Sequence, residues 1–378
     1  MTFSNKEREA RHQAILEVMK KEDLKAIILV GDTNIGPSIC GDLRYYNDVS
    51  VIFYRQVVLI FLDYEPVLIA MSEISRQAAS KRSSVRDCRS TEDFIGETSR
   101  LLKQRQILKG RIGVSFQMIP YSWFQFLKEE LPEIEWVEIH DLMMTLRLKR
   151  RSEEIEVLRR GAMLCDGGFE SALKMIKHGV SEYEIVAAIE HYARANGAES
   201  HFTLIGSGRF SIKENRLPLP YAPSLRRIER GDSVLMEITP RYEGYWTQLV
   251  RTVNVGEPNE DLEKLKVVCE GAIREGLKYL KPKSTIKDIV LTMESYVNHC
   301  GFLLKAPIGH LCGIDLVEAR MSPQNEMPLE AGIAVIIHPT IFTPDGKTSF
   351  FWGETYLVTH DGFERMNKST DQLLTLKS

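Results

Sequence analysis

The sequence predicts an α+β protein of two domains. Its 378 residues are enough for two hydrophobic cores, since single domains usually hold roughly 100–200 residues. Apolar strand-like runs alternate with amphipathic helical segments along the chain. A charged, helix-forming stretch near the middle separates the two halves, and the predicted domains are therefore 1–148 and 149–378.

The first half predicts a sheet covered by helices. A helix is expected from Glu7 to Lys21, followed by a strand from Ala26 to Gly31. Three further runs rich in Val, Ile and aromatic residues predict strands at 49–54, 56–63 and 66–71. No sequence repeat is present, so we expect an ordinary α/β domain.

The second half begins with a long predicted helix from Leu146 to Ile176, where apolar residues recur at spacings of three and four among charged ones. Ser181 followed by Glu184 is a capping signature for the next helix. Strands such as SVLMEIT and AVIIHPTIF then alternate with helices at 262–279 and 285–299. The second domain is therefore expected to be α+β.

Composition excludes several classes of function. The net charge is −3 and the pI is about 6.4, and Lys and Arg are scattered, which argues against nucleic acid and anionic membrane partners. No apolar run approaches the roughly 18–20 residues of a membrane helix, and the start MTFSNKEREARHQ lacks the apolar core of a signal peptide. The six cysteines show no CxxC spacing, so neither a disulfide framework nor structural zinc is expected. We expect a cytoplasmic protein with a small-molecule or peptide substrate.

Seven motifs occur in a fixed order over more than 200 residues. They are RSEEIEVLRRGAMLCDGG, GVSEYEIVAAIE, HFTLIGSG, RRIERGDSVLMEITPRYEGYWTQLVRTVNVG, IGHLCGIDLVEA, MPLEAGIAVIIHP and GETYLVTHDG. Together they resemble the creatinase, prolidase and aminopeptidase P superfamily. The resemblance implies a creatinase-type N-terminal domain, a C-terminal pita-bread domain whose sheet holds the active site, and a homodimer.

The resemblance also implies where a metal site would lie. In the metallopeptidase members, two divalent metals are held by two aspartates eleven residues apart, one histidine and two glutamates. These ligand positions fall on Glu237, Gln248, His310, His338 and Gly353. Only His310 is unchanged, while Gln248 lacks the bridging charge and Gly353 lacks a side chain. We therefore expect no metal pair and no cofactor.

Two residues near these ligand positions also differ from the metallopeptidase pattern. Glu354 follows the empty ligand position, but successive strand residues point to opposite faces, so it reaches the site only if a β-bulge intervenes. A histidine that assists peptidase turnover in the family is replaced by Val317. Glu354 and Gln248 are instead assigned to substrate binding.

Three residues are predicted to be catalytic, namely Glu237, His310 and His338. A carboxylate among apolar strand residues needs a partner or a raised pKa, and its alternative role is a salt-bridged strand residue. A single histidine is more often structural than catalytic, but the resemblance favours function. We predict that Glu237 is a nucleophile or general base, while the two histidines move protons to the leaving nitrogen.

Aromatic residues flank the site motifs and are predicted to contact the substrate, with ordinary core packing as their alternative. These are Tyr221, Trp246 and Trp352, and Tyr221 falls near a substrate-contacting histidine of creatinase-like members. Tyr54 and Arg55 resemble a segment that reaches into the neighbouring subunit's site in creatinase-like dimers. Arg55 is predicted to pair there with a substrate carboxylate.

The leading hypothesis is a metal-independent hydrolase that cleaves a C–N bond in a small non-peptide molecule, as creatinase and ectoine hydrolase do. An amidine, a guanidinium or a cyclic substrate fits this chemistry. A second hypothesis places one divalent metal on Glu237, His310 and His338, for a hydrolase or lyase. A third is a non-catalytic binding protein, and a fourth is an Xaa-Pro metallopeptidase, which the altered ligand positions disfavour.

Overall fold

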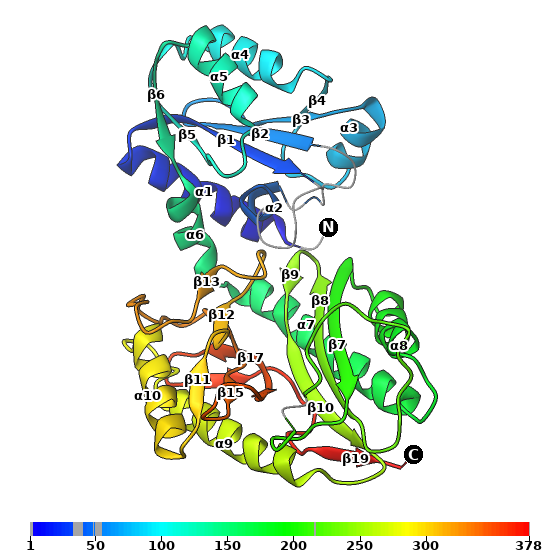
Figure 1. The fold of residues 1–378 in the computed structure, drawn as a ribbon. Helices are drawn as coiled ribbons and strands as arrows, with labels where there is room; N and C mark the ends of the chain where they lie inside the picture. The colour runs from blue at the N-terminus through cyan, green and yellow to red at the C-terminus, as the bar shows by residue number, and fades with distance from the viewer. Residues whose placement is uncertain (1–2, 33–40, 48, 50–54, 215–216, 378) are drawn as a thin grey trace. The chain divides into compact units, whose positions relative to one another are not determined.

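The computed structural model describes most of the chain (Figure 1). It covers residues 3–32, 41–47, 49, 55–214 and 217–377. The chain divides into two compact units, Met1–Leu148 and Lys149–Ser378, and each has its own sheet. Within the described residues, no helix is both long and apolar enough to span a bilayer.

The first unit holds a six-stranded mixed sheet with the order β4-β3-β2-β1-β5-β6. Its strands are β1 (Leu24–Asp32), β2 (Arg55–Phe61), β3 (Val67–Ala70), β4 (Asp87–Ser90), β5 (Lys109–Val114) and β6 (Glu133–Glu138). Its helices are α1 (Asn5–Lys21), α2 (Gly41–Asn47), α3 (Glu73–Ser80), α4 (Phe94–Gln104), α5 (Tyr121–Glu130) and α6 (His140–Leu148). Figure 1 shows α4 and α5 on one face of this sheet and α1 on the other.

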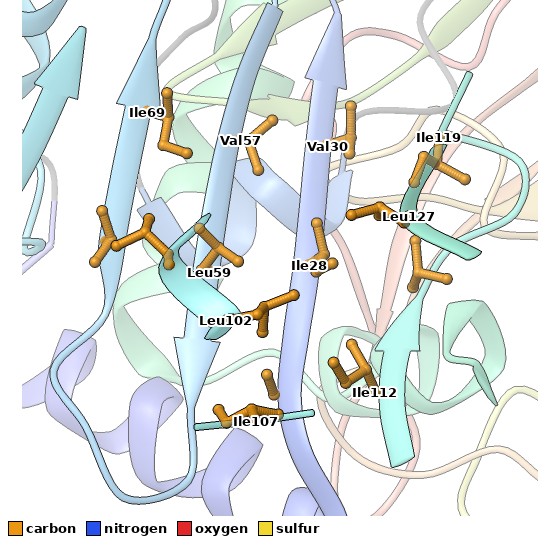
Figure 2. Packing of buried hydrophobic residues seen from close by; sticks show 14 of the residues in the cluster. Ile28, Val30, Val57, Leu59, Ile69, Leu102, Ile107, Ile112, Ile119 and Leu127 are labelled. Atoms are coloured by element: carbon orange, nitrogen blue, oxygen red, sulfur yellow. The ribbon is translucent and has the colours of Figure 1, made fainter. Parts of the chain in front are cut away.

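Alternation along the strands builds the core of the first unit. Ile28 and Val30 of β1 point to one side and pack with Leu102 of α4 and Leu127 of α5 (Figure 2). Helix α1 begins two residues earlier than predicted, because the Ser4 hydroxyl caps it. Most of the predicted strand at 49–54 lies outside the described residues.

The second unit holds a ten-stranded sheet with the main order β13-β12-β14-β17-β10-β8-β7. Its strands are β7 (Ser200–Gly208), β8 (Ser233–Tyr242), β9 (Tyr245–Trp246), β10 (Leu249–Val255), β12 (Gly309–Leu311), β13 (Ala319–Arg320), β14 (Ala334–Ile337), β17 (Gly353–Val358), β18 (Phe363–Arg365) and β19 (Leu374–Leu376). A separate three-stranded sheet contains β11 (Leu303–Lys305), β15 (Thr340–Phe342) and β16 (Ser349–Phe351). The helices are α7 (Ser152–Met175), α8 (Glu182–Ala195), α9 (Glu260–Leu277) and α10 (Ile286–His299).

One helix boundary is confirmed and one prediction is wrong. At α8, the Ser181 hydroxyl accepts the Glu184 N–H, and the Glu184 carboxylate accepts the Ser181 N–H, as the capping signature predicts. The continuous helix predicted over 146–176 is instead two helices, α6 and α7. The chain leaves helical geometry at Arg150, whose N–H donates to the Gly332 carbonyl and whose guanidinium pairs with the buried Glu318.

The large sheet has two chemically different faces, because directly paired residues of neighbouring strands point to the same side. The pairing of β8, β10 and β17 defines an inner face marked by Glu237, Val250 and Gly353, and a helix face marked by Ile238, Leu249 and Glu354. On the helix face, Ile238 and Leu249 pack with Cys165 and Phe169 of α7. The candidate site lies on the inner face.

Candidate active site

Glu237 is held on the inner face by Gln248. The Gln248 Nε2 donates to Glu237 Oε1 at 2.5 Å and to Thr239 Oγ1 at 3.2 Å. The main chain of Gln248 is fixed in turn by Thr355, whose hydroxyl accepts the Gln248 N–H and donates to the Gln248 carbonyl, both at 2.9 Å. Strand β17 therefore fixes the segment just before β10, and this segment orients the carboxyl group on β8.

Burial raises the pKa of Glu237 to about 7, although the hydrogen bond from Gln248 lowers it in part. The side chain stays partly exposed. Both the protonated and the ionised carboxyl are consequently present near neutral pH. A group with this property can both accept and return a proton.

His310 of β12 and His338, just after β14, form a second pair on the inner face. Their ring centroids are 5.3 Å apart, and Phe351 packs edge-on against His338 at 4.8 Å. Burial lowers the pKa of His310 to about 4. Burial and the neighbouring His310 lower the pKa of His338 to about 3. Both imidazoles are therefore uncharged at neutral pH.

Gly353 lies where the backbone of β14 comes close to β17. A Cβ atom at Gly353 would be 2.1 Å from the Ile337 carbonyl oxygen and 2.5 Å from both Cα and Cβ of His338. A glutamate cannot occupy this position unless the backbone moves. The position thus offers no metal ligand, and His338 fills the adjacent space.

Among the buried polar atoms of the inner face, three near the predicted site have no hydrogen-bond partner within the described part of the chain. They are Gln248 Oε1, His338 Nδ1 and Trp246 Nε1. Trp246 belongs to this face because the intervening Thr247 points at α7, with its Oγ1 2.8 Å from where a Cβ on Gly161 would lie. Buried polar groups are normally paired, so these atoms are available to a bound molecule.

The structure does not bring all predicted site residues together. Trp352 and Glu354 lie on the helix face, since β17 alternates without a bulge from Gly353. Glu354 accepts hydrogen bonds from Arg251 and Arg365, each at 2.5 Å. Neither Trp352 nor Glu354 faces Glu237.

The remaining candidates are Tyr221, Arg55 and Tyr54. Tyr221 is 76% exposed and bridges to Ile205 beyond the edge strand β7. Arg55 begins β2 in the first unit, where its guanidinium lies 5.3 Å from the Trp123 ring centroid. Tyr54 lies outside the described residues. The homodimer and the role of Arg55 in it stay predictions.

Two supporting residues were missed by the sequence analysis. Thr239 accepts a hydrogen bond from Gln248, and Thr355 fixes the Gln248 main chain. Thr239 could have been found, because it follows Glu237 by two residues and shares its face. Thr355 gave no such signal, because its contact depends on the pairing of strands distant in sequence.

The inner face does not fit a pair of metal ions. Across the described residues, no three His, Cys, Asp or Glu side chains are grouped closely enough to hold one. Glu237 and Gly353 are two strands apart, about 10 Å between Cα atoms, and Gly353 has no side chain to bridge that span. The Gln248 amide nitrogen is turned toward Glu237 rather than toward a cation.

Comparisons with known proteins define the class. Residues 11–149 match the creatinase/prolidase N-terminal domain, and residues 156–360, more than half of the chain, match metallopeptidase family M24. The predicted fold, a creatinase-type domain followed by a pita-bread domain, is confirmed. The chain belongs to metallopeptidase family M24.

Full-length relatives agree with this assignment. An Xaa-Pro dipeptidase from Pyrococcus horikoshii is 25% identical over 95% of this chain and 97% of its own. A creatinase from a Bacillus species is 24% identical over 97% of this chain and 92% of its own. The solved Xaa-Pro dipeptidase from Bacillus anthracis superposes with a TM-score of 0.84 at 25% identity, over 98% of this chain and 100% of that one.

These findings correct two predictions. A hydrolase acting on a C–N bond is supported, but the family and its dipeptidase members are peptidases, so the predicted metal-independent, non-peptide reaction is wrong. The prediction of no cofactor is overturned as well, because the family is one of metallopeptidases. The altered ligand positions remain a property of this chain, but they do not determine which bond is cleaved.

Proposed function

We propose that this chain hydrolyses a peptide-type C–N bond on the inner face, with Xaa-Pro dipeptides as its substrate class. Membership of family M24 supports hydrolysis of such a bond. Relatives named Xaa-Pro dipeptidase support the substrate class. The observation that carries the proposal is the Glu237 carboxyl, held by Gln248 and with a pKa of about 7, inside the matched region.

Each of these side chains has a separate role in the proposed hydrolysis. Ionised Glu237 takes a proton from the attacking water, whose oxygen bonds to the carbonyl carbon, and returns the proton to the nitrogen when the C–N bond breaks. His310 and His338 are uncharged and can hydrogen-bond the water or the carbonyl oxygen. Gln248 Oε1 offers an acceptor and Trp246 Nε1 a donor to the backbone of a short peptide.

No step in this scheme passes through a metal, because the ligand set of a metal pair does not fit the inner face. Whether activity requires a metal ion must therefore be measured. Each assay therefore needs three arms, with added Mn²⁺, with added Co²⁺ and with a chelator.

The test is proline release from a panel of Xaa-Pro dipeptides, beside matched dipeptides without proline. We expect release from the Xaa-Pro set. Glu237→Gln should lower turnover by about a hundredfold or more, and the pH profile of the wild type should show a limb near pH 7 that the variant lacks.

Glu263→Gln, at an exposed position of α9, is the matched control and should keep full activity. The proposal fails if no dipeptide is cleaved in any arm. It also fails if Glu237→Gln turns over at the wild-type rate.

A further inference from the structure

A cavity of about 550 Å³ lies on the helix face, between α9 and strands β17 and β18. We call it the α9 pocket, lined among others by Ile273, Arg274, Leu277, Trp352, Phe363 and Arg365. Its volume falls within the roughly 300–1,000 Å³ typical of small-molecule sites. Glu354 also lines it, so the pocket opens on the face opposite Glu237, and the proposed hydrolysis does not use it.

Apolar side chains line two sides of the α9 pocket. Ile273 and Leu277 come from α9, while Trp352 and Tyr356 are buried and come from the β17 side. Phe363 is 41% exposed, and its ring lies 5.9 Å from that of Tyr356. Aromatic and aliphatic walls on opposite sides favour a ligand with a flat apolar body.

Two guanidiniums meet at the β17 side of the pocket. Two guanidiniums, Arg251 and Arg365, share the single carboxylate of Glu354. The Tyr356 hydroxyl donates to Glu354, and burial raises the pKa of Tyr356 well above its usual value, so it adds no negative charge. Arg251 is fully buried, where a balancing anion is most valuable.

The other charges of the lining are largely matched. Lys266 pairs with Glu270, and Glu275 pairs with Lys278, each at 2.5 Å. Asp371 acts electrostatically on Arg365. Arg274 is 67% exposed, and Glu275, which already pairs with Lys278, lies 3.9 Å from it. The cations of the pocket and its surroundings outnumber the carboxylates by one, and this excess favours one anionic group on the ligand.

We propose that the α9 pocket is a second ligand site, which takes a small carboxylate with an aromatic or aliphatic body. The carboxylate pairs with Arg365 and Arg274, since guanidinium groups bind carboxylates in a two-point geometry. The body lies between Phe363 and Leu277. This site is separate from the proposed hydrolysis and goes beyond it.

Occupation of the pocket would bear on the inner face through β17. Gly353 is part of the pocket lining, and a Cβ at this position would lie 2.5 Å from the Cα of His338. A ligand on one side of this strand thus contacts the segment that positions an imidazole on the other.

The test uses phenylacetate as the probe and calorimetric titration of the full chain. We expect one site per chain with a Kd below about 1 mM. Phenylacetamide has the same shape without the charge and should bind at least about tenfold more weakly. Intrinsic tryptophan fluorescence should follow the same saturation curve, because Trp352 forms part of the wall.

Two variants separate the pocket from adventitious binding. Ile273→Trp fills the pocket and should abolish binding, whereas Leu291→Trp adds the same side chain at an exposed position of α10 and should not. Arg274→Gln keeps the fold at an exposed site and should weaken binding at least about tenfold. The proposal is overturned if phenylacetate does not bind up to about 10 mM, if phenylacetamide binds equally well, or if Ile273→Trp and Arg274→Gln bind like the wild type. Glu237→Gln should bind phenylacetate normally, so this result does not depend on hydrolysis.

Discussion

Two glutamates on strands β8 and β17 of the pita-bread sheet, with β10 between them, behave in opposite ways. Glu237 on the inner face meets one neutral amide, and burial raises its pKa to about 7. Burial also acts on Glu354 on the helix face, but Arg251 and Arg365 outweigh it and hold the pKa of Glu354 below its usual value. The charge of a buried carboxyl is thus decided by its partners rather than by its depth.

Glu237 can change its charge near neutral pH, whereas Glu354 cannot. Glu354 is fixed by two arginines and a tyrosine, and it stabilises the sheet. Within the described residues, Glu237 forms no ion pair with a cation. It can therefore bind and release a proton near pH 7.

The largest effect is expected from Arg251→Met, which removes the buried partner of Glu354. Arg365 still pairs with Glu354 in this variant, but the carbonyls of Gly353 and Thr370 lose their guanidinium donor. Because these contacts are buried or half-buried, we expect the free energy of unfolding to fall by about 3 kcal/mol. Chemical denaturation measures it. The control is Arg159→Met, which breaks the half-exposed pair with Glu364 and should cost at most about 1 kcal/mol. Equal losses in the two variants would show that Glu354 is not held by charge.

A smaller effect is expected from Gly353→Ala, at the point where β17 meets His338. The new Cβ would lie 2.1 Å from the Ile337 carbonyl oxygen, a backbone atom that cannot simply rotate away. We expect a loss of about 2 kcal/mol in unfolding free energy, the usual range for overpacking. Gly362→Ala is the control, because nothing lies within 4 Å of a Cβ there. A neutral Gly353→Ala would mean that the strands separate easily and that the position can accept a ligand again.

Local features were predictable from the sequence, and long-range ones were not. The capping of α8 and the opposite faces of Gly353 and Glu354 follow from short spacings, and both are present. The break before α7 depends on Glu318 and Gly332, which are far from Arg150 in the sequence, so helical periodicity could not reveal it.

The candidate site shows the same division. Alternation along β8 placed Glu237 on a defined face, and a raised pKa was among the expectations for it. The contact of His310 with His338 requires β12 and β14 to be neighbours, which only the folded sheet supplies. The predicted substrate class was wrong because it was inferred from the missing metal ligands. Those ligands bear on the mechanism, whereas the bond that is cleaved depends on the whole site.

The contributions of the two glutamates to the free energy of unfolding should depend differently on pH. Glu237 has a folded pKa of about 7 against an ordinary value of 4.5, so the folded state binds more protons and stability falls as pH rises between these values. Glu237→Gln removes that fall, and its stability relative to the wild type should increase between about pH 5 and pH 8. We expect a gain of about 1 kcal/mol, below the roughly 3 kcal/mol of a full shift, because the side chain is partly exposed.

Glu354 has a lowered pKa, so its stabilisation is present above 4.5 and is lost only as pH falls through the folded value. Glu354→Gln should therefore lose the same stability at about pH 5 and about pH 8. Denaturant unfolding at both pH values measures the two differences in one experiment. If Glu237→Gln shows no change in relative stability between them, its carboxyl is not raised in pKa, and the proton transfer assigned to it loses its physical basis.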